Sequence, residues 1–204
     1  MVVSSGSSVP TRQRLVTAAA ELLRRQGYAA TGIKAILTAA GAPYGSLYHF
    51  FPGGKAELGR AVIEEGGVAY RELVEAFYRD DVDSLDATRE LFEGGADLLE
   101  STGFADACPI ATIAGEIADT HEAMRAAAAA AFGSWTATLA DHLVAHGSDP
   151  ARADATAIEL FCLIEGAFLH ARTTRSADAV RIAGRRAVAI VAEAVAPVGS
   201  MAPQ

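Results

Sequence analysis

Apolar residues at helical spacing, interrupted at intervals by glycine and proline, are the feature that most constrains how this chain can fold. They recur every three or four positions along almost the whole sequence, and no segment of the sequence alternates with the two-residue period of a half-buried strand. A helix is predicted over 11–26, and two short helices follow it before residue 51. Longer segments predict helices over 55–80, 84–102, 107–118, 120–146, 150–174 and 176–195. The expected fold class is all-α, with about nine helices.

The two short segments between residues 31 and 50 form a helix–turn–helix pattern. Thr31 is predicted to cap the first of them, and the turn Gly41-Ala42-Pro43 places proline at a favourable helix start. The second covers 44–50, with Leu47, Phe50 and Phe51 expected to pack inward. We therefore divide the chain into an N-terminal arm and helix–turn–helix domain, 1–53, and a C-terminal helical bundle, 54–204. Residues 1–10 are expected to be a disordered arm and 197–204 a frayed tail.

Composition narrows the class of protein. Half of the residues are apolar (51%) and 21% are charged, which is typical of a globular chain and excludes an intrinsically disordered one. No apolar run reaches the roughly 18–20 residues that a membrane span needs. The two cysteines lie far apart in the sequence, as expected for reduced thiols in a cytoplasmic protein.

The net charge of −8 hides a strong asymmetry between the two ends of the chain. Through Arg60 there are seven basic and two acidic residues, a net charge of +5. The remaining ten basic and 23 acidic residues give −13. A basic head on an acidic body suits a protein that presents only one end to nucleic acid, although solvated surface charge clustered by chance would look the same.

The head closely resembles the DNA-binding signature of the tetracycline-repressor (TetR) family. The matching stretches are Thr31-Gly32-Ile33, Ala39-Ala40-Gly41-Ala42, Gly45-Ser46-Leu47-Tyr48-His49-Phe50-Phe51 and Gly54-Lys55-Ala56-Glu57-Leu58. The resemblance covers about residues 11–60 and implies a transcriptional regulator that binds double-stranded operator DNA. The candidate DNA-binding residues are Thr31, Lys34, Ala42, Pro43, Tyr44, Gly45, Ser46, Tyr48, His49 and Lys55.

These candidates divide by the part of the duplex that they would contact. Lys34, Tyr48, His49 and Lys55 are expected at phosphates, and Thr31 at a helix N-terminus that favours a phosphate. Tyr44, with Ala42 or Pro43, is better placed to read base edges. Relatives with this turn often carry lysine where this chain has Tyr44, so their operators do not transfer to it. The alternative for Tyr44 and Tyr48 is an ordinary aromatic residue at the edge of the core.

The body resembles the LmrA/YxaF-like subgroup through Cys108-Pro109-Ile110-Ala111 and through the Pro-Gly-Gly-Lys stretch at 52–55. The resemblance implies a homodimer formed by the last two long helices and a cavity for a small lipophilic effector. The candidate interface residues are Ile158, Cys162, Leu169, Val180, Ala183 and Ala187, although these faces could equally pack within one chain. The candidate ligand-binding residues are Phe92, Leu99, Ile113, Glu116, Trp135, Phe161, Glu165 and Phe168.

Among these candidates, Glu116 and Glu165 stand out because a carboxylate on an apolar face is costly unless it is paired. We expect each to meet Arg172, another polar partner or a cationic effector. His142 and His146, four residues apart, are expected to interact with a helix C-terminus rather than to bind zinc. No metal, cofactor or catalytic set is indicated by the sequence, so an enzyme is not expected.

The function indicated is a ligand-responsive regulator, in the leading interpretation a repressor that a small effector releases from its operator. Two alternatives remain open on the sequence. One is an activator with the same fold. The other is a helical small-molecule-binding protein or enzyme whose DNA-binding head is vestigial.

Overall fold

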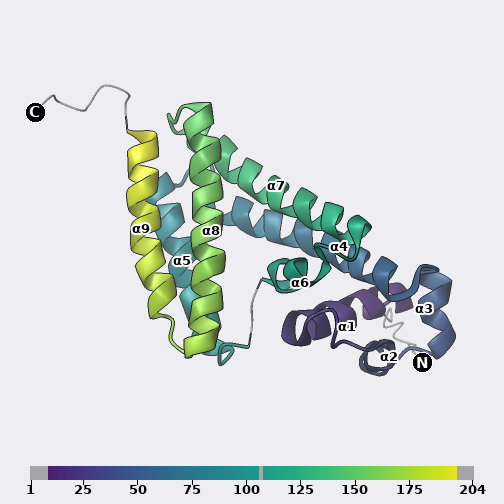
Figure 1. Ribbon diagram of the computed structural model, residues 1–204. Helices are drawn as coiled ribbons and strands as arrows, with labels where there is room; N and C mark the ends of the chain where they lie inside the picture. The colour runs from purple at the N-terminus through teal and green to yellow at the C-terminus, as the bar shows by residue number, and fades with distance from the viewer. Residues whose placement is uncertain (1–8, 106–107, 197–204) are drawn as a thin grey trace, which may run out of the picture.

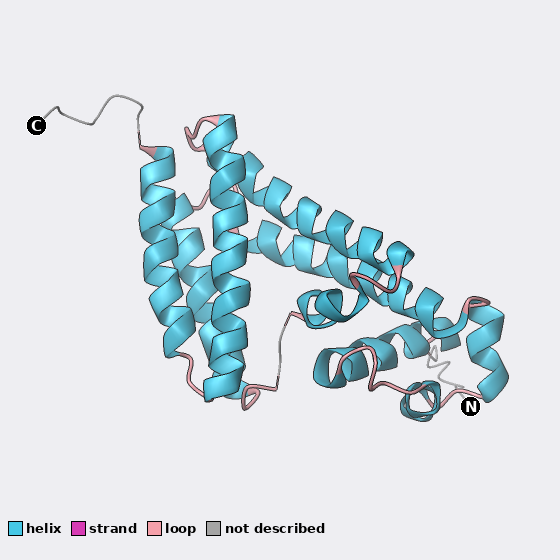
Figure 2. Ribbon diagram, viewed as in Figure 1, coloured by secondary structure: helices cyan, strands magenta, loops and turns pink. Residues whose placement is uncertain are grey.

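The computed structural model describes residues 9–105 and 108–196, and every regular element in those ranges is an α-helix (Figures 1 and 2). The helices are α1 Thr11–Gln26, α2 Ile33–Ala40, α3 Tyr44–Phe50, α4 Gly54–Phe77, α5 Ser84–Ser101, α6 Pro109–Ile117, α7 Glu122–Ala145, α8 Pro150–Thr174 and α9 Asp178–Val195. Each lies within a few residues of its predicted range, so the all-α prediction is confirmed. The predictions for residues 1–8, 107 and 197–204 lie outside the described residues. No helix in the described ranges is long and apolar enough to cross a membrane.

The helices form a head at one end and a bundle at the other (Figure 1). Helices α1–α3 make up the head. Helices α4 and α7 pack side by side and run from the head into the bundle, where α5, α8 and α9 complete the body. Helix α6 lies between, in contact with α1, α4 and α7. A single 24-residue helix, α4, thus joins the two ends without a linker.

Local chemistry accounts for several of the boundaries. The Asp83 carboxylate accepts hydrogen bonds from the backbone N–H groups of Leu85 and Asp86, and Asp149 caps α8 in the same way. Gly41 ends α2 in the left-handed conformation, at φ 56°, which glycine adopts without the penalty that a side chain imposes. The predicted cap at Thr31 is wrong: Gly32 is the N-cap of α2, and the buried Thr31 hydroxyl donates instead to the carbonyl of Gly27 at 2.7 Å.

Two apolar cores hold the described residues together. The first joins the head to the body, since Leu15, Leu47 and Leu58 share it with Ile113 of α6 and Met124 of α7. The second lies among α5, α7, α8 and α9 and contains Phe92, Leu99, Val180 and Ala187. Each core buries large side chains completely, and burial of one such side chain stabilises the fold by about 1.5–3 kcal/mol.

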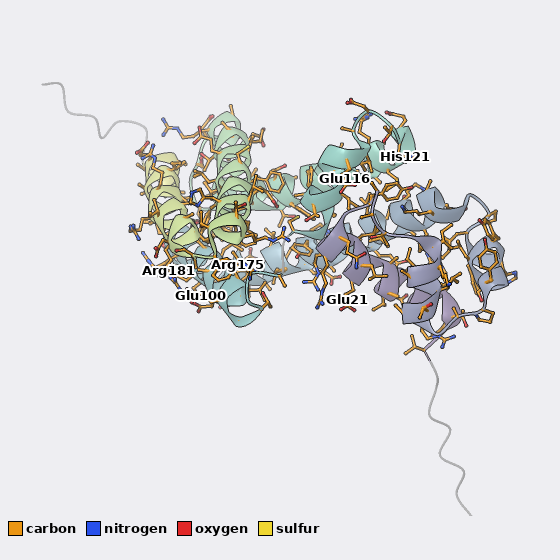
Figure 3. The ribbon with its side chains drawn as sticks, turned by 60° about the horizontal axis from the view of Figure 1, so that its bottom comes forward. Glu21, Glu100, Glu116, His121, Arg175 and Arg181 are labelled. Atoms are coloured by element: carbon orange, nitrogen blue, oxygen red, sulfur yellow. The ribbon has the colours of Figure 1, made fainter. Side chains whose placement is uncertain are left out.

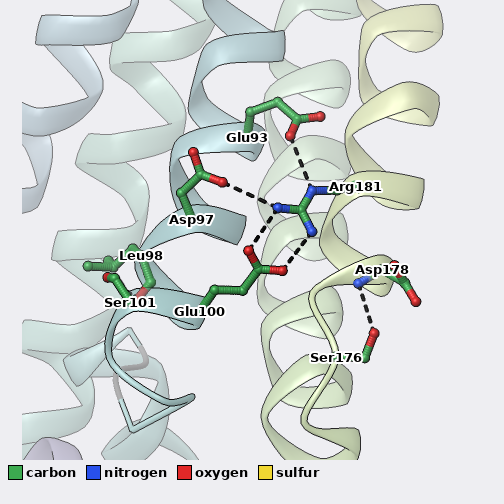
Figure 4. Close-up of polar contacts among 8 residues, drawn as sticks. All are labelled: Glu93, Asp97, Leu98, Glu100, Ser101, Ser176, Asp178 and Arg181. Carbon is green, nitrogen blue, oxygen red and sulfur yellow. Dashed lines mark hydrogen bonds and ion pairs between the residues drawn. The ribbon is translucent and has the colours of Figure 1, made fainter.

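The α9 residues predicted for the dimer interface instead pack inside the single chain. Val180 and Ala187 are fully buried within the single chain, and Ala183 is nearly so. At the edge of this contact, the guanidinium of Arg181 meets Glu93, Asp97 and Glu100 of α5 at 2.8–3.4 Å (Figure 4). The α9 stripe therefore packs against α5 of the same chain and is not free to meet a partner.

Candidate nucleic-acid interface and ligand cavity

Helix α3 is anchored on one side and exposed on the other. Leu47 is fully buried and Phe51, just after the helix, is nearly so. Tyr44 and Tyr48 are 67% and 46% exposed, with ring centroids 6.1 Å apart. Phe50 is 36% exposed, so its predicted inward packing is wrong. The outer face of α3 thus exposes aromatic rings that do not pack in the core.

The other exposed candidates flank this aromatic pair. Gly45, on α3, has open space where a side chain would stand, and His49 is exposed one turn later. Pro43 is exposed at the start of α3, and Lys34 is exposed on α2. Ala42 and Ser46 are partly buried. Thr31 is separate from this surface because its side chain is buried and its hydroxyl is bonded within the loop.

Lys55, in the first turn of α4, contacts the loop between α1 and α2. Its ammonium donates to the carbonyl of Tyr28 at 2.6 Å and lies 4.2 Å from the centroid of the Tyr28 ring. Burial lowers the pKa of Lys55, and the negative charge of Glu116 opposes that effect. The structure therefore gives Lys55 a structural partner where the sequence predicted a phosphate contact.

Glu116, predicted to face a ligand, instead holds the same loop from the body side. Its carboxylate accepts from the backbone N–H groups of Ala29 at 2.7 Å and Tyr28 at 3.2 Å. Figure 3 shows Glu116 beside His121, whose ring meets that of Tyr28 at a centroid distance of 5.0 Å. A side chain at Gly27, where φ is 81°, would collide with the Glu116 carboxylate. This contact connects the C-terminal end of α6 to the head.

A cavity of about 350 Å³ lies in the body among α4, α5, α7 and α8. Its wall is mostly aromatic and aliphatic. The residues are Tyr70, Leu73, Val74, Phe77 and Tyr78 from the α4 side, Leu91, Gly94, Gly95 and Leu98 of α5, Cys108 at the N-cap of α6, Trp135, Thr136 and Leu139 of α7, and Ala157, Leu160, Phe161, Ile164, Glu165 and Phe168 of α8. The volume and the apolar lining suit a small lipophilic molecule.

Four of the eight predicted ligand-binding residues line this cavity: Trp135, Phe161, Glu165 and Phe168. The other four do not. Phe92 and Leu99 are buried in the second core, Ile113 is buried in the first, and Glu116 binds the α1–α2 loop. Sequence reasoning missed the wall supplied by α4, although Tyr70, Leu73, Val74 and Phe77 have the spacing of one helical face.

Among the residues that the structure describes, Glu165 is the one charged side chain on the cavity wall. Burial raises the pKa of its carboxyl group, and a hydrogen bond with the Cys108 thiol partly offsets that rise. Burial, and then the charge of Glu165, also raise the pKa of Cys108, which keeps that thiol protonated. Arg172 does not pair with the Glu165 carboxylate, since the Arg172 Nε donates to the carbonyl of Phe104 at 3.4 Å. Of the partners predicted for Glu116 and Glu165, Arg172 is therefore not the one found; Glu116 meets the polar backbone groups of Tyr28 and Ala29.

The three most exposed large apolar residues of the described body lie on α8 and α9. Leu169 is 69% exposed, Ile158 and Ile182 are similarly open, and Cys162 is exposed between the two α8 residues. Ile158, Cys162 and Leu169 were predicted from their spacing. Ile182 was not predicted, because the small-residue stripe of α9, which packs against α5, is the more conspicuous feature of that helix.

Comparisons with known proteins agree with this architecture. Residues 15–62 match the family of bacterial regulatory proteins called the tetR family, and residues 84–186 match the C-terminal domain of LmrA/YxaF-like transcriptional regulators. An uncharacterised HTH-type transcriptional regulator of Mycobacterium tuberculosis is 36% identical, over 80% of this chain and 85% of that protein. The HTH-type transcriptional regulator LmrA of Bacillus subtilis is 30% identical, over 81% of this chain and 88% of LmrA.

A solved structure shows the same fold. The regulatory protein TetR from Rhodobacter sphaeroides superposes with a TM-score of 0.78 at 27% identity, covering 88% of this chain and 98% of that one. Proteins of this family are transcriptional regulators rather than enzymes, and they are typically ligand-responsive repressors that bind operator DNA and dimerise. The chain is a member of the TetR family of transcriptional regulators, with a body of the LmrA/YxaF-like type.

Proposed function

We propose that this protein is a repressor that binds operator DNA as a homodimer and leaves it when a small lipophilic effector enters the cavity of the body. The observation that carries the proposal is the placement of an exposed, aromatic α3 at one end of α4 and an apolar cavity against the other end. In this division of labour, residues 1–53 contact DNA and residues 54–204 bind the effector and dimerise. Because its target is chromosomal DNA, we place the protein in the cytoplasm.

The contacts to the duplex follow from the exposed residues of the head. We assign the phosphate contacts to Lys34, Tyr48 and His49, which are all exposed. Tyr44 and Pro43 stand at the N-terminal end of α3, the end that enters the major groove first in a helix–turn–helix protein. Gly45 and Ser46 are small enough to let the backbone approach the base edges. Basic character at this end and acidic character in the body favour binding through the head alone.

The dimer places two such heads on one operator. We assign its interface to the exposed apolar residues Ile158, Cys162 and Leu169 of α8 with Ile182 of α9. An interface of this kind relates two chains by a two-fold axis. The two copies of α3 would then have to meet successive major grooves, about 34–36 Å apart.

A route from cavity to head runs along α6. Cys108, at the N-cap of this helix, lines the cavity and hydrogen-bonds to Glu165. Glu116, near its other end, holds the α1–α2 loop. An effector that displaces Cys108 would shift α6 and loosen the Glu116 contact, which changes the placement of the head relative to the body.

DNA binding is tested by fluorescence anisotropy with a duplex from the region upstream of the protein's own gene, over a series of salt concentrations. Affinity should fall steeply with salt, and Lys34→Ala should reduce the slope of log K against log salt by about 1 for each chain. Tyr44→Ala should reduce discrimination between this duplex and a scrambled one. Arg71→Ala, on the α4 segment beside the cavity, is the control and should change neither. Affinity that does not depend on salt, or equal effects of Lys34→Ala and Arg71→Ala, would contradict the proposal.

A further inference from the structure

The polar groups around the cavity are unequally available to a ligand. The Trp135 indole N–H donates to the carbonyl of Gly67 at 2.7 Å, and the Tyr78 hydroxyl lies 2.9 Å from that of Thr88. The Thr136 hydroxyl donates to the backbone carbonyl of Phe132 at 3.1 Å. These three groups are already satisfied inside the protein. Glu165 differs, since its hydrogen bond with the Cys108 thiol leaves acceptor capacity on the carboxylate.

Aromatic rings gather on the same part of the wall. On α8, Phe161 lies about one turn before Glu165 and Phe168 about one turn after it. The Trp135 ring contacts those of Tyr70 and Phe161 at centroid distances of 5.4 and 6.0 Å. The faces of such rings carry partial negative charge and attract a cation, most strongly where water is excluded. No basic side chain lines the cavity among the described residues.

We infer that the effector is a lipophilic amine with one positive charge, whose ammonium group pairs with the Glu165 carboxylate while its aromatic body lies against Trp135, Phe161 and Phe168. This inference rests on the proposed function only in calling the ligand an effector, because binding to the cavity can be measured without DNA. The same wall disfavours an anionic ligand. Such a ligand would bring a second negative charge beside Glu165 with no basic side chain to compensate it.

The protonation of Glu165 makes this assignment testable by a change of pH. Because burial raises the pKa of this carboxyl group, a proton is held more tightly in the empty cavity than in a solvated glutamate. An ammonium ion binds the ionised form, so amine affinity should fall as the pH is lowered from neutral toward the ordinary range of glutamate. The other titratable groups on the wall are Cys108, Tyr70 and Tyr78. Burial raises the pKa values of Cys108 and Tyr78, which therefore stay uncharged over that interval.

Three probes of the same shape separate charge from lipophilicity: 4-phenylbenzylamine, 4-phenylbenzyl alcohol and biphenyl-4-carboxylate. Binding is measured by isothermal titration calorimetry and by quenching of Trp135, which is the single tryptophan of the chain and part of the cavity wall. The amine should bind about tenfold more tightly than the alcohol, and the carboxylate most weakly. Lowering the pH should weaken binding of the amine and leave that of the alcohol unchanged.

Two glutamate variants provide the matched comparison. Glu165→Gln should reduce amine affinity to that of the alcohol and leave alcohol binding within about twofold. Glu122→Gln removes an exposed carboxylate far from the cavity wall and should change neither. The inference is overturned if the alcohol binds wild-type protein as tightly as the amine, if the amine does not bind, or if both variants weaken it equally. Should Glu165→Gln fail to fold by circular dichroism, the pH series on wild-type protein decides in its place.

A separate measurement distinguishes this inference from the proposed function. The amine is titrated into the complex of protein and upstream duplex, and anisotropy reports release of the DNA. An amine that binds in a Glu165-dependent way without releasing DNA leaves the ligand chemistry intact and contradicts the effector mechanism. Release of the DNA by the alcohol and by the amine at equal concentrations would support the effector mechanism and contradict the inference that the effector carries a positive charge.

Discussion

Gly67 of α4 lies directly against Ala131 of α7: a methyl group placed on Gly67 would come within 2.9 Å of the Ala131 Cβ. The two long helices approach this closely because neither brings a larger side chain to the contact. Gly66, the preceding residue, has no atom within 4 Å of the corresponding position. Gly66 and Gly67 are therefore adjacent glycines of one helix, of which only Gly66 has space for a side chain.

Gly67→Ala should destabilise the protein by about 1 kcal/mol, because overpacking of α4 against α7 outweighs the gain in helix propensity. Gly66→Ala should stabilise it by about 0.5–1 kcal/mol, since only the propensity changes. Urea unfolding followed by circular dichroism measures both free energies of unfolding. If the two variants shifted stability in the same direction, the close α4–α7 contact would be refuted.

Glu116→Gln should weaken the communication between cavity and head. The amide presents one acceptor where two N–H donors require acceptors, so the α1–α2 loop loses about 1 kcal/mol of anchorage at this exposed site. We expect effector binding to persist and the effector-induced loss of operator affinity to shrink. The measurement is operator affinity with and without saturating effector. Glu122→Gln, which removes an exposed carboxylate paired with Arg125, is the control and should behave as wild type.

Stability should fall in mild acid because of His142. Its Nε2 lies 3.0 Å from the Ser84 hydroxyl and its Nδ1 lies 3.1 Å from the Tyr78 carbonyl, so the buried ring joins the ends of α4, α5 and α7. Burial, and then repulsion from His146, lower its pKa below the ordinary value of 6.5. The folded state thus binds fewer protons than the unfolded state in mild acid. The stability contributed by neutral His142 is complete above pH 6.5 and is lost as the pH falls below it.

Chemical denaturation at a series of pH values checks this expectation. His142→Gln, which can keep the contact to Ser84 but cannot be protonated, should flatten the pH dependence while lowering stability at neutral pH. His49→Gln, at an exposed position on α3, should leave the dependence unchanged. Equal slopes for wild type and His142→Gln would assign the acid sensitivity to other groups.

Leu169→Glu should raise the dimer dissociation constant at least about tenfold, because it places a charge at the centre of an apolar interface. The monomer should keep its fold, since Leu169 is 69% exposed in the single chain. Analytical ultracentrifugation over a concentration series measures the equilibrium. Val68→Glu makes the same change at an exposed position on α4 and should leave the dimer intact. Dissociation by both variants, or by neither, would place the interface elsewhere.

The helices were predictable because their signals are local. The Gly41-Ala42-Pro43 turn and the helical spacing of apolar residues act within a few positions along the chain, and they locate α1, α3 and α8 closely. The predicted interaction of the histidine pair with a helix C-terminus is local for His146, whose Nδ1 lies 2.8 Å from the carbonyl of His142 in the last turn of α7. The ring of His142 instead contacts Ser84 and the Tyr78 carbonyl, which are distant in the sequence. The N-cap predicted at Thr31 was wrong because a threonine that caps a helix and a threonine with a buried hydroxyl give the same sequence signal.

The cavity was only half predictable because its wall depends on contacts between distant segments. Phe92 and Phe168 are both aromatic residues on apolar helical faces, and nothing in the residues themselves says that one meets α9 while the other borders an open space. Glu116 was correctly singled out as a carboxylate that needs partners. Those partners are backbone N–H groups 87 and 88 positions earlier in the chain, which no spacing rule identifies.

The shared core of the head and α6–α7 has a consequence for engineering. A chimeric biosensor made at the predicted domain boundary would join residues 1–53 to a foreign ligand-binding domain. Here Leu58 of α4, Ile113 of α6 and Met124 of α7 pack in the same core as Leu15 and Leu47, so such a cut would divide one folding unit. A transplant that keeps α4 and α6 together with α1–α3, and the α7 residues that cover them, would preserve that unit.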